Sequence, residues 1–150
     1  MKKDFKRLSE YAGELFAAGF TRKEVYEHIL MEFDGTPYVW GGQSPMGSDC
    51  SGSVCTAMSL AAGKAVRVTA DGLFREFFTK VAADFSDKTL LYAVFFLDEK
   101  GKAVHVAGWC GGKYMNVSSR EPNKSGSFRT GTELMRLYSH LTMIKRGMRI

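Results

Sequence analysis

A glycine-rich loop that runs directly into an apolar segment is the feature that most constrains this chain. Residues 35–49 are rich in glycine and carry aromatic side chains, whereas residues 51–62 lack proline and contain alanine, methionine and leucine. Gly63 then stands where a helix C-cap belongs. Cys50 therefore lies at or next to a helix N-terminus, where unpaired N–H groups and the helix dipole favour a thiolate over a thiol. The pattern predicts a reactive cysteine with a lowered pKa.

The composition is that of one globular domain. The chain has 150 residues, of which 45% are hydrophobic and 25% are charged, and this length is sufficient for one core. We expect a single domain over residues 1–150, with a helical extension over residues 1–33 and a catalytic core over residues 34–150. The longest apolar run, residues 90–97, is far shorter than a membrane span, so we expect none.

Charge and cysteine usage restrict the partners. The net charge of +5 suits an anionic partner. The lysines and arginines are scattered, however, so we expect no nucleic acid partner. Three cysteines cannot all pair with one another, and none has the spacing of metal ligands. We therefore expect no metal, no cofactor and no disulfide framework.

Amphipathic spacing predicts four helices besides the one that follows Cys50. The second of them begins with a capping box that starts at Thr21. We expect the first two helices to form a small subdomain packed on the core, with docking or delivery as the alternative role. The predicted helices cover residues 4–18, 21–33, 69–83 and 134–141.

Alternating and β-branched patterns predict a sheet. The second and third strands flank Gly111 and Gly112, which form a two-residue hairpin turn. Residues 121–131 are predicted to form a polar loop. Helices followed by strands predict an α+β domain. The predicted strands cover residues 89–97, 103–110, 113–119 and, at the sheet edge, 142–150.

A cysteine hydrolase needs a base near the sulfur and a polar group that orients the base. His28 and His140 lie in or near predicted helices, and we expect each to be a surface or helix-end residue. His105 lies in an otherwise apolar strand, where a histidine taken alone is more simply a buried residue with satisfied hydrogen bonds.

The predicted hairpin register favours a catalytic role for His105. Alternation along the two strands places His105, Asn116 and Ser118 on one face. Asn116 is then a diagonal neighbour of His105, with the backbones roughly 7 Å apart. A side-chain oxygen of Asn116 can accept the imidazole N–H, and Ser118 is the alternative orienting residue. A slip by one residue would move Asn116 to the other face.

Two short motifs carry a family resemblance. Residues 37–42 read Pro-Tyr-Val-Trp-Gly-Gly and residues 49–52 read Asp-Cys-Ser-Gly. Together they resemble the nucleophile motif of the NlpC-type peptidoglycan cysteine peptidases. The strands that carry His105 and Asn116 are also similar to those of this family. The resemblance implies a papain-like fold with the nucleophile helix packed on an antiparallel sheet.

The resemblance also implies residue roles. Cys50 is implied as the nucleophile, His105 as the base and Asn116 as the orienting residue. The Tyr38 hydroxyl and the Cys50 N–H are implied to form an oxyanion hole, a kind of site that can lower a barrier by roughly 3 kcal/mol. Tyr38 is alternatively an aromatic wall of the loop. The implied substrate contacts are Asp49, Ser51 and Trp40.

Two of these contacts have other readings. Asp49 is also placed to cap the helix, and the two roles are compatible. Trp40 either lines the cleft or packs beneath it, and the sequence does not decide between these positions.

The implied activity is hydrolysis of amide bonds in peptidoglycan stem peptides, with the D-γ-glutamyl–diamino acid bond as the expected target. The alternatives are amide hydrolysis or acyl transfer on a non-wall substrate, and an inert wall-binding module. The first residues are charged and show no apolar signal-peptide core. We therefore expect synthesis in the cytoplasm and delivery to the wall by a phage or a secretion system, with an immunity or delivery protein as a partner.

Overall fold

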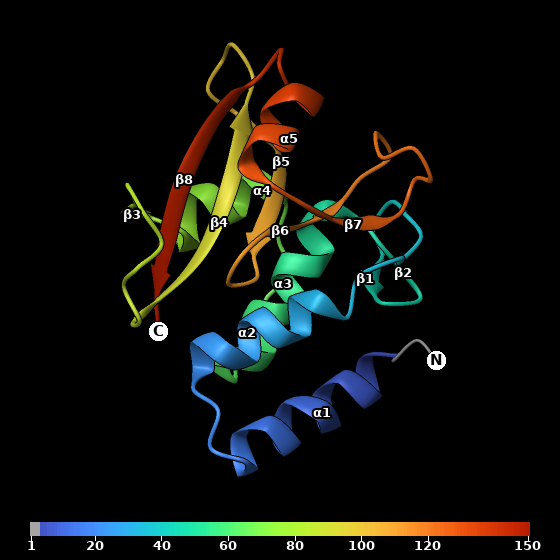
Figure 1. The fold of residues 1–150 in the computed structure, drawn as a ribbon, viewed down its shortest axis with the longest axis vertical. Coiled ribbons are helices and arrows are strands. Elements are labelled where there is room, and N and C mark those ends of the chain that lie inside the picture. Colours follow the sequence, from blue (N-terminus) through green and yellow to red (C-terminus); the bar gives the residue numbers. More distant parts are fainter. Residues whose placement is uncertain (1–3) are drawn as a thin grey trace.

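The computed structural model describes residues 4–150, which form an α+β fold. Three helices from the first half of the chain pack against a six-stranded antiparallel sheet (Figure 1). Figure 1 shows α2 lying between α1 and α3, so α1 reaches the sheet mainly through the other two helices. The three helices are α1 (Phe5–Ala17), α2 (Arg22–Met31) and α3 (Cys50–Ala62).

The ends of helices α2 and α3 are set by residues that the sequence analysis identified. Thr21 and Glu24 form the predicted capping box at the start of α2. Asp49 caps α3 by accepting a hydrogen bond from the Gly52 N–H, and Gly63 ends this helix with a φ of 71°. A left-handed conformation of this kind is unstrained in glycine. The predicted helices over the first 63 residues are therefore confirmed.

The large sheet has the strand order β3-β8-β4-β5-β6-β7. Its central strand β4 is buried along its whole length because apolar residues pack on both faces of the sheet. Helices α2 and α3 cover one face, with α1 packed on these two helices, and α5 (Gly131–Leu137) covers part of the other face. The strands are β3 (Lys80–Val81), β4 (Leu90–Leu97), β5 (Ala103–Trp109), β6 (Tyr114–Val117), β7 (Gly126–Arg129) and β8 (Thr142–Arg149).

The β5–β6 hairpin has the predicted register. Trp109 pairs with Tyr114, Gly108 pairs with Met115, and the Cys110 N–H bonds the Lys113 carbonyl at 2.8 Å. A second hairpin, β1 (Gln43–Ser44) with β2 (Gly47–Ser48), lies within the glycine-rich loop. The segment before β1 runs beside the segment before β7 and joins it through backbone hydrogen bonds.

The predicted helix over residues 69–83 is wrong beyond its first half. Helix α4 (Ala70–Gly72) continues into a π-helical turn over Leu73–Phe77, and the Phe78 N–H bonds the Leu73 carbonyl at 2.8 Å. The wider turn lets Phe74 and Phe78 both pack on Phe95, with ring centroids 5.3 and 5.7 Å away. Lys80 and Val81 then pair with β8. Long-range packing and strand pairing therefore override the helical spacing.

Two predictions near the C-terminus also need correction. Residues 121–131 include β7, which pairs with β6 over four residues, so this segment is not only a polar loop. Strand β8 is not the edge of the sheet, since β3 pairs with it on the side away from β4. The short helix predicted over residues 134–141 is present as α5, but it begins and ends earlier, at Gly131 and Leu137. Among residues 4–150, no helix has both the length and the apolar character needed to cross a membrane.

Candidate active site

Close backbone packing places Cys50 at the first position of α3. The glycine-rich loop crosses the first turn of this helix so tightly that a Cβ atom at Gly52 would lie 2.0 Å from the Gly42 carbonyl oxygen. A Cβ atom at Gly42 would lie 2.4 Å from the Gly47 carbonyl oxygen. Both contacts are far inside van der Waals distance, so these positions exclude any side chain. The glycines of the motif are thus what lets the loop hold Cys50 at the helix start.

Asp49 is held by several donors at once. It accepts the Gly52 N–H at 2.7 Å, the Gly41 N–H at 2.9 Å and two hydrogen bonds of 3.0 Å from Arg67. Arg67 also donates to the Ser51 hydroxyl at 3.0 Å. Asp49 and Ser51 both border the cleft, and Arg67 binds both of them. The sequence analysis missed Arg67, because no motif marks it and its partners lie 16 and 18 residues away.

His105 and Asn116 meet on one face of the sheet. The Nε2 atom of His105 lies 2.6 Å from the Oδ1 atom of Asn116, and both side chains are buried. The imidazole stacks on the Tyr138 ring with centroids 4.2 Å apart and planes 21° apart. Ser118, the alternative orienting residue, instead accepts a hydrogen bond from the Tyr138 hydroxyl. The sequence analysis missed Tyr138, which comes from the end of α5, far along the chain.

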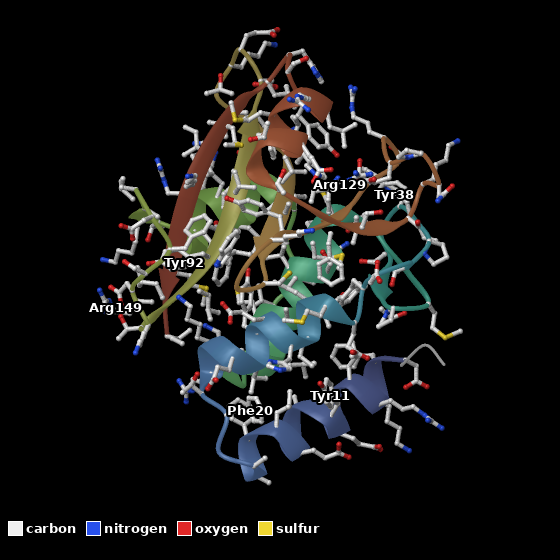
Figure 2. All side chains as sticks on the ribbon, in the orientation of Figure 1. Tyr11, Phe20, Tyr38, Tyr92, Arg129 and Arg149 are labelled. Carbon is white, nitrogen blue, oxygen red and sulfur yellow. The ribbon has the colours of Figure 1, made fainter. Side chains whose placement is uncertain are left out.

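A buried carboxylate lies behind Asn116. The Asn116 Nδ2 atom donates to Glu121 Oε2 at 2.8 Å, and Glu121 is only 2% exposed. Arg129, at the end of β7 (Figure 2), pairs with both oxygens of Glu121. Sequence reasoning assigned Glu121 and Arg129 to a polar loop or its margin and gave neither a role. The register of β6 with β7 is what brings them to Asn116.

The site opens into a cleft of about 890 Å³. Cys50, His105 and Tyr138 all border this cleft. Tyr38, on the segment that precedes β1 (Figure 2), is half-buried and also borders the cleft. Trp40 is 86% exposed at the rim, so it lines the cleft and does not pack beneath it.

The other two histidines lie away from this pair. His28 lies on α2, and its Nδ1 atom is 2.8 Å from the Glu24 carbonyl oxygen. His140 is exposed, as expected, but it borders the far part of the cleft, where its Nε2 atom lies 3.2 Å from the Arg120 guanidinium. The hydrogen bond to Asn116 is made by His105, whereas His28 and His140 have other partners. Across residues 4–150, no group of three or more His, Cys, Asp and Glu side chains is placed to hold a metal ion.

The protonation states of the resting site differ from the prediction. Burial raises the pKa of the Cys50 thiol to about 11, and backbone hydrogen bonds, the largest from Val106, offset this only in part. Burial lowers the pKa of His105 to about 4, against the opposing effects of Asn116 and Glu121. At neutral pH the resting site therefore holds a thiol and a neutral imidazole. The predicted lowering of the Cys50 pKa is wrong for this state, because desolvation outweighs the helix N-terminus.

These groups can perform nucleophilic catalysis. A thiol in an open cleft, an imidazole on the same cleft and an amide that binds the far ring nitrogen match the arrangement of a cysteine–histidine–asparagine hydrolase. The neutral imidazole is in the state that accepts a proton. The site therefore holds a thiol and a neutral imidazole, the protonation states from which a concerted attack on a carbonyl starts.

Comparison with solved structures agrees with this geometry. The NlpC/p60 domain of the peptidoglycan hydrolase SagA has a TM-score of 0.59 and 21% identity, over 84% of this chain and 97% of that chain. NlpC2 from Trichomonas vaginalis has a TM-score of 0.63 and 20% identity, over 87% of this chain and 48% of that chain. An NlpC/P60 family protein from Bacillus cereus has a TM-score of 0.57 and 23% identity, over 82% and 39% of the two chains.

The chain thus spans nearly the whole SagA domain but less than half of the Trichomonas and Bacillus proteins. At these identities the likeness establishes a shared fold. Among curated proteins, no sequence matches the chain. The model of the NlpC/P60 family matches residues 35–130, well over half of the chain. This match includes the cysteine loop, the β5–β6 hairpin and β7, and so this chain belongs to the NlpC/P60 family, a family of cysteine peptidases that includes peptidoglycan hydrolases.

Proposed function

We propose that this protein is an endopeptidase that cleaves the D-γ-glutamyl–diamino acid bond of peptidoglycan stem peptides. The observation that carries the proposal is the shared cleft, which both Cys50 and His105 border, with Asn116 buried behind His105 and bound to its far ring nitrogen. Family membership supports the wall substrate, and the geometry supports the chemistry. Both supports are needed, because the same fold hosts different substrates.

The proposed reaction begins with proton transfer from the Cys50 thiol to His105. Because Asn116 Oδ1 is an acceptor, the Nε2 atom of His105 carries the ring proton, and its Nδ1 atom holds a free lone pair. Nδ1 takes the thiol proton while the sulfur attacks the amide carbonyl carbon. The imidazolium then protonates the departing amine, which leaves a thioester on Cys50. A water molecule, deprotonated by His105, releases the acid and restores the thiol.

The oxyanion that forms during the attack needs hydrogen-bond donors. We propose the Cys50 backbone N–H and the Tyr38 hydroxyl for this role. Tyr38 stays protonated, since burial first, and then the negative charge that Cys50 and Asp49 can carry, raise its pKa. A hydroxyl that keeps its proton in this way is a suitable donor to developing negative charge.

Charge at the cleft supports an anionic substrate. Lys102 and Arg120 are exposed and border the cleft, whereas Arg67 is already bound to Asp49. Stem peptides carry free carboxylates next to the amide bond that we propose is cleaved. Lys102 and Arg120 are therefore the proposed contacts for these carboxylates, and Asp49, Ser51 and Trp40 are the proposed contacts for the rest of the peptide.

The test is digestion of purified peptidoglycan with the full chain, followed by mass analysis of the released fragments. We expect fragments that end at D-glutamate, and none from Cys50→Ala or His105→Ala. Asn116→Ala should keep a residual rate, since an orienting residue is less critical than the nucleophile. Fragments cleaved at another bond would overturn the bond assignment. Hydrolysis by Cys50→Ala would overturn the mechanism.

A further inference from the structure

A row of polar side chains leads from His105 away from the cleft. It consists of Asn116 and Glu121, which are buried, and Arg129, which is half-buried. Asn116 is fully buried between His105, at 2.6 Å, and Glu121, at 2.8 Å. Glu121 in turn pairs with Arg129, whose Nη1 atom lies 3.2 Å from Glu133. Neither Glu121 nor Arg129 borders the cleft, so neither touches the substrate. Together the residues form a line from the base to the outer strand of the sheet.

The direction of each hydrogen bond in this line follows from the carboxylate. An ionised carboxylate can only accept hydrogen bonds, so Asn116 must turn its NH₂ group toward Glu121. The Asn116 oxygen then faces His105, and it accepts a hydrogen bond from this ring only if His105 carries its proton on Nε2. That proton position leaves Nδ1 as the basic nitrogen. An asparagine without this neighbour would be able to present either its oxygen or its nitrogen to the ring.

We propose that Glu121 is a positioning residue, which selects the catalytic tautomer of His105 by fixing the orientation of the Asn116 amide. The proposal rests on the proposed function, because it concerns the base of the same reaction. It adds a fourth residue, which contacts Asn116 and does not touch the substrate.

Arg129 keeps Glu121 in the state that this role requires. Burial by itself raises the pKa of Glu121, but hydrogen bonds from Arg129 and Asn116 and the charge of Arg129 outweigh burial and leave the pKa below its usual value. The guanidinium binds both carboxylate oxygens, with Nε at 3.1 and 2.9 Å. Charge-assisted bonds of this kind are stronger than neutral ones. Arg129 therefore holds the carboxylate ionised and fixed in place.

The substitution Glu121→Gln tests the proposal because it has nearly the same shape. A glutamine has one oxygen, and the charged Arg129 competes for it with Asn116. The stronger bond goes to Arg129, which leaves the glutamine NH₂ group facing the Asn116 NH₂ group. Asn116 relieves this clash by rotating, so that its NH₂ group faces His105. His105 must then move its proton to Nδ1, and it loses its basic nitrogen at the cleft.

The measurement combines kinetics with the tautomer itself. We expect Glu121→Gln to lower kcat/KM by about 100-fold or more, in line with the effect of a wrong histidine tautomer elsewhere. It should be slower than Asn116→Ala, which imposes no tautomer. NMR of the full chain labelled with ¹⁵N-histidine should show His105 protonated on Nε2 in the wild type and on Nδ1 in Glu121→Gln. Glu133→Gln is the matched control. It removes the charge of the second carboxylate that pairs with Arg129, but a glutamine can still form the capping box of α5. This substitution should change neither kcat/KM nor the His105 tautomer.

A double variant separates positioning from folding. In Glu121→Gln combined with Arg129→Met, the charged competitor for the glutamine oxygen is removed, so Asn116 can return to its original orientation. We expect the double variant to be more active than Glu121→Gln alone and to regain the Nε2 tautomer. A role in folding alone predicts the reverse order, since the double variant loses more contacts. That order, or an unchanged tautomer in Glu121→Gln, would overturn the proposal.

The tautomer measurement and the rate of Cys50 alkylation by iodoacetamide need no peptidoglycan. If the wild type shows the Nε2 tautomer and Glu121→Gln shows the Nδ1 tautomer, the role of Glu121 is upheld even where no wall fragment is released. In that case only the proposed substrate fails.

Discussion

Arg67 donates two hydrogen bonds, each 3.0 Å long, to the two carboxylate oxygens of Asp49. Asp49 at the same time caps α3 and accepts the Gly41 N–H from the glycine-rich loop. The Asp49 carboxylate thus connects the first turn of α3, the glycine-rich loop and the segment that carries Arg67, directly before Cys50. The position of Cys50 therefore depends on a residue that lies 17 positions further along the chain.

Arg67→Met should destabilise the fold and reduce activity together. Arg67 is about one-third exposed, so we expect a loss of about 1–2 kcal/mol in the free energy of unfolding, near the lower end for hydrogen bonds to charged groups. Urea unfolding measures this loss. Arg75→Met is the matched control, because Arg75 forms an exposed pair with Asp71, and exposed pairs contribute little. Equal effects of the two substitutions would show that the Asp49 pair has no special importance.

Alkylation should single out Cys50 and should accelerate with pH. Cys50 borders the cleft, whereas Cys55 and Cys110 are buried, and burial raises the pKa of both of those thiols. Since the pKa of Cys50 is about 11, the rate should rise steadily from pH 7 to pH 10. Mass mapping after brief iodoacetamide treatment identifies the modified residue. A rate that is already maximal near pH 6 would show a resting thiolate, and equal labelling of all three cysteines would remove Cys50 as the reactive thiol.

His105 should make the protein less stable as the pH falls from about 6.5 to about 4. Burial lowers its folded-state pKa to about 4, whereas the unfolded chain has an ordinary value near 6.5. In this window the unfolded chain binds a proton at His105 that the folded chain does not, so unfolding is favoured. The expected loss at pH 4.5 is about 2–3 kcal/mol.

Urea unfolding of the wild type and of His105→Gln, at several pH values, checks this expectation. The carboxyl groups contribute equally to both proteins, so the difference between the two curves isolates His105. The difference should grow toward low pH and level off above pH 7. Parallel curves would mean that His105 is accessible to protons in the folded protein.

The protein should be toxic when directed to the periplasm of a Gram-negative host and harmless in the cytoplasm. The proposed substrate lies outside the inner membrane, so fusion of the chain to an export signal should cause lysis that requires an intact Cys50. Recovery of cleaved stem peptides from the wall links the lysis to hydrolysis. Lysis by exported Cys50→Ala would indicate membrane damage, and toxicity of the cytoplasmic form would favour an intracellular amide substrate.

The sequence by itself determined the parts of the site that depend on local pattern. The residues between Asp49 and Gly63 define the nucleophile helix, because a cap at each end and an apolar segment between them are readable within a few residues. The Gly111–Gly112 turn likewise determines the face that His105 and Asn116 share, because strand side chains alternate strictly. These features were predictable since no distant residue is needed to produce them.

The remainder of the site was decided only by tertiary structure. Arg67, Tyr138 and Glu121 reach the site through chain reversals and strand pairing, and no local pattern records those contacts. The helix predicted over residues 69–83 ends early, at Phe77, because Phe78 packs on Phe95. The charge states were decided in the same way. The helix N-terminus favours a thiolate at Cys50, but desolvation depends on everything that surrounds the sulfur, and in the folded chain desolvation is the stronger effect.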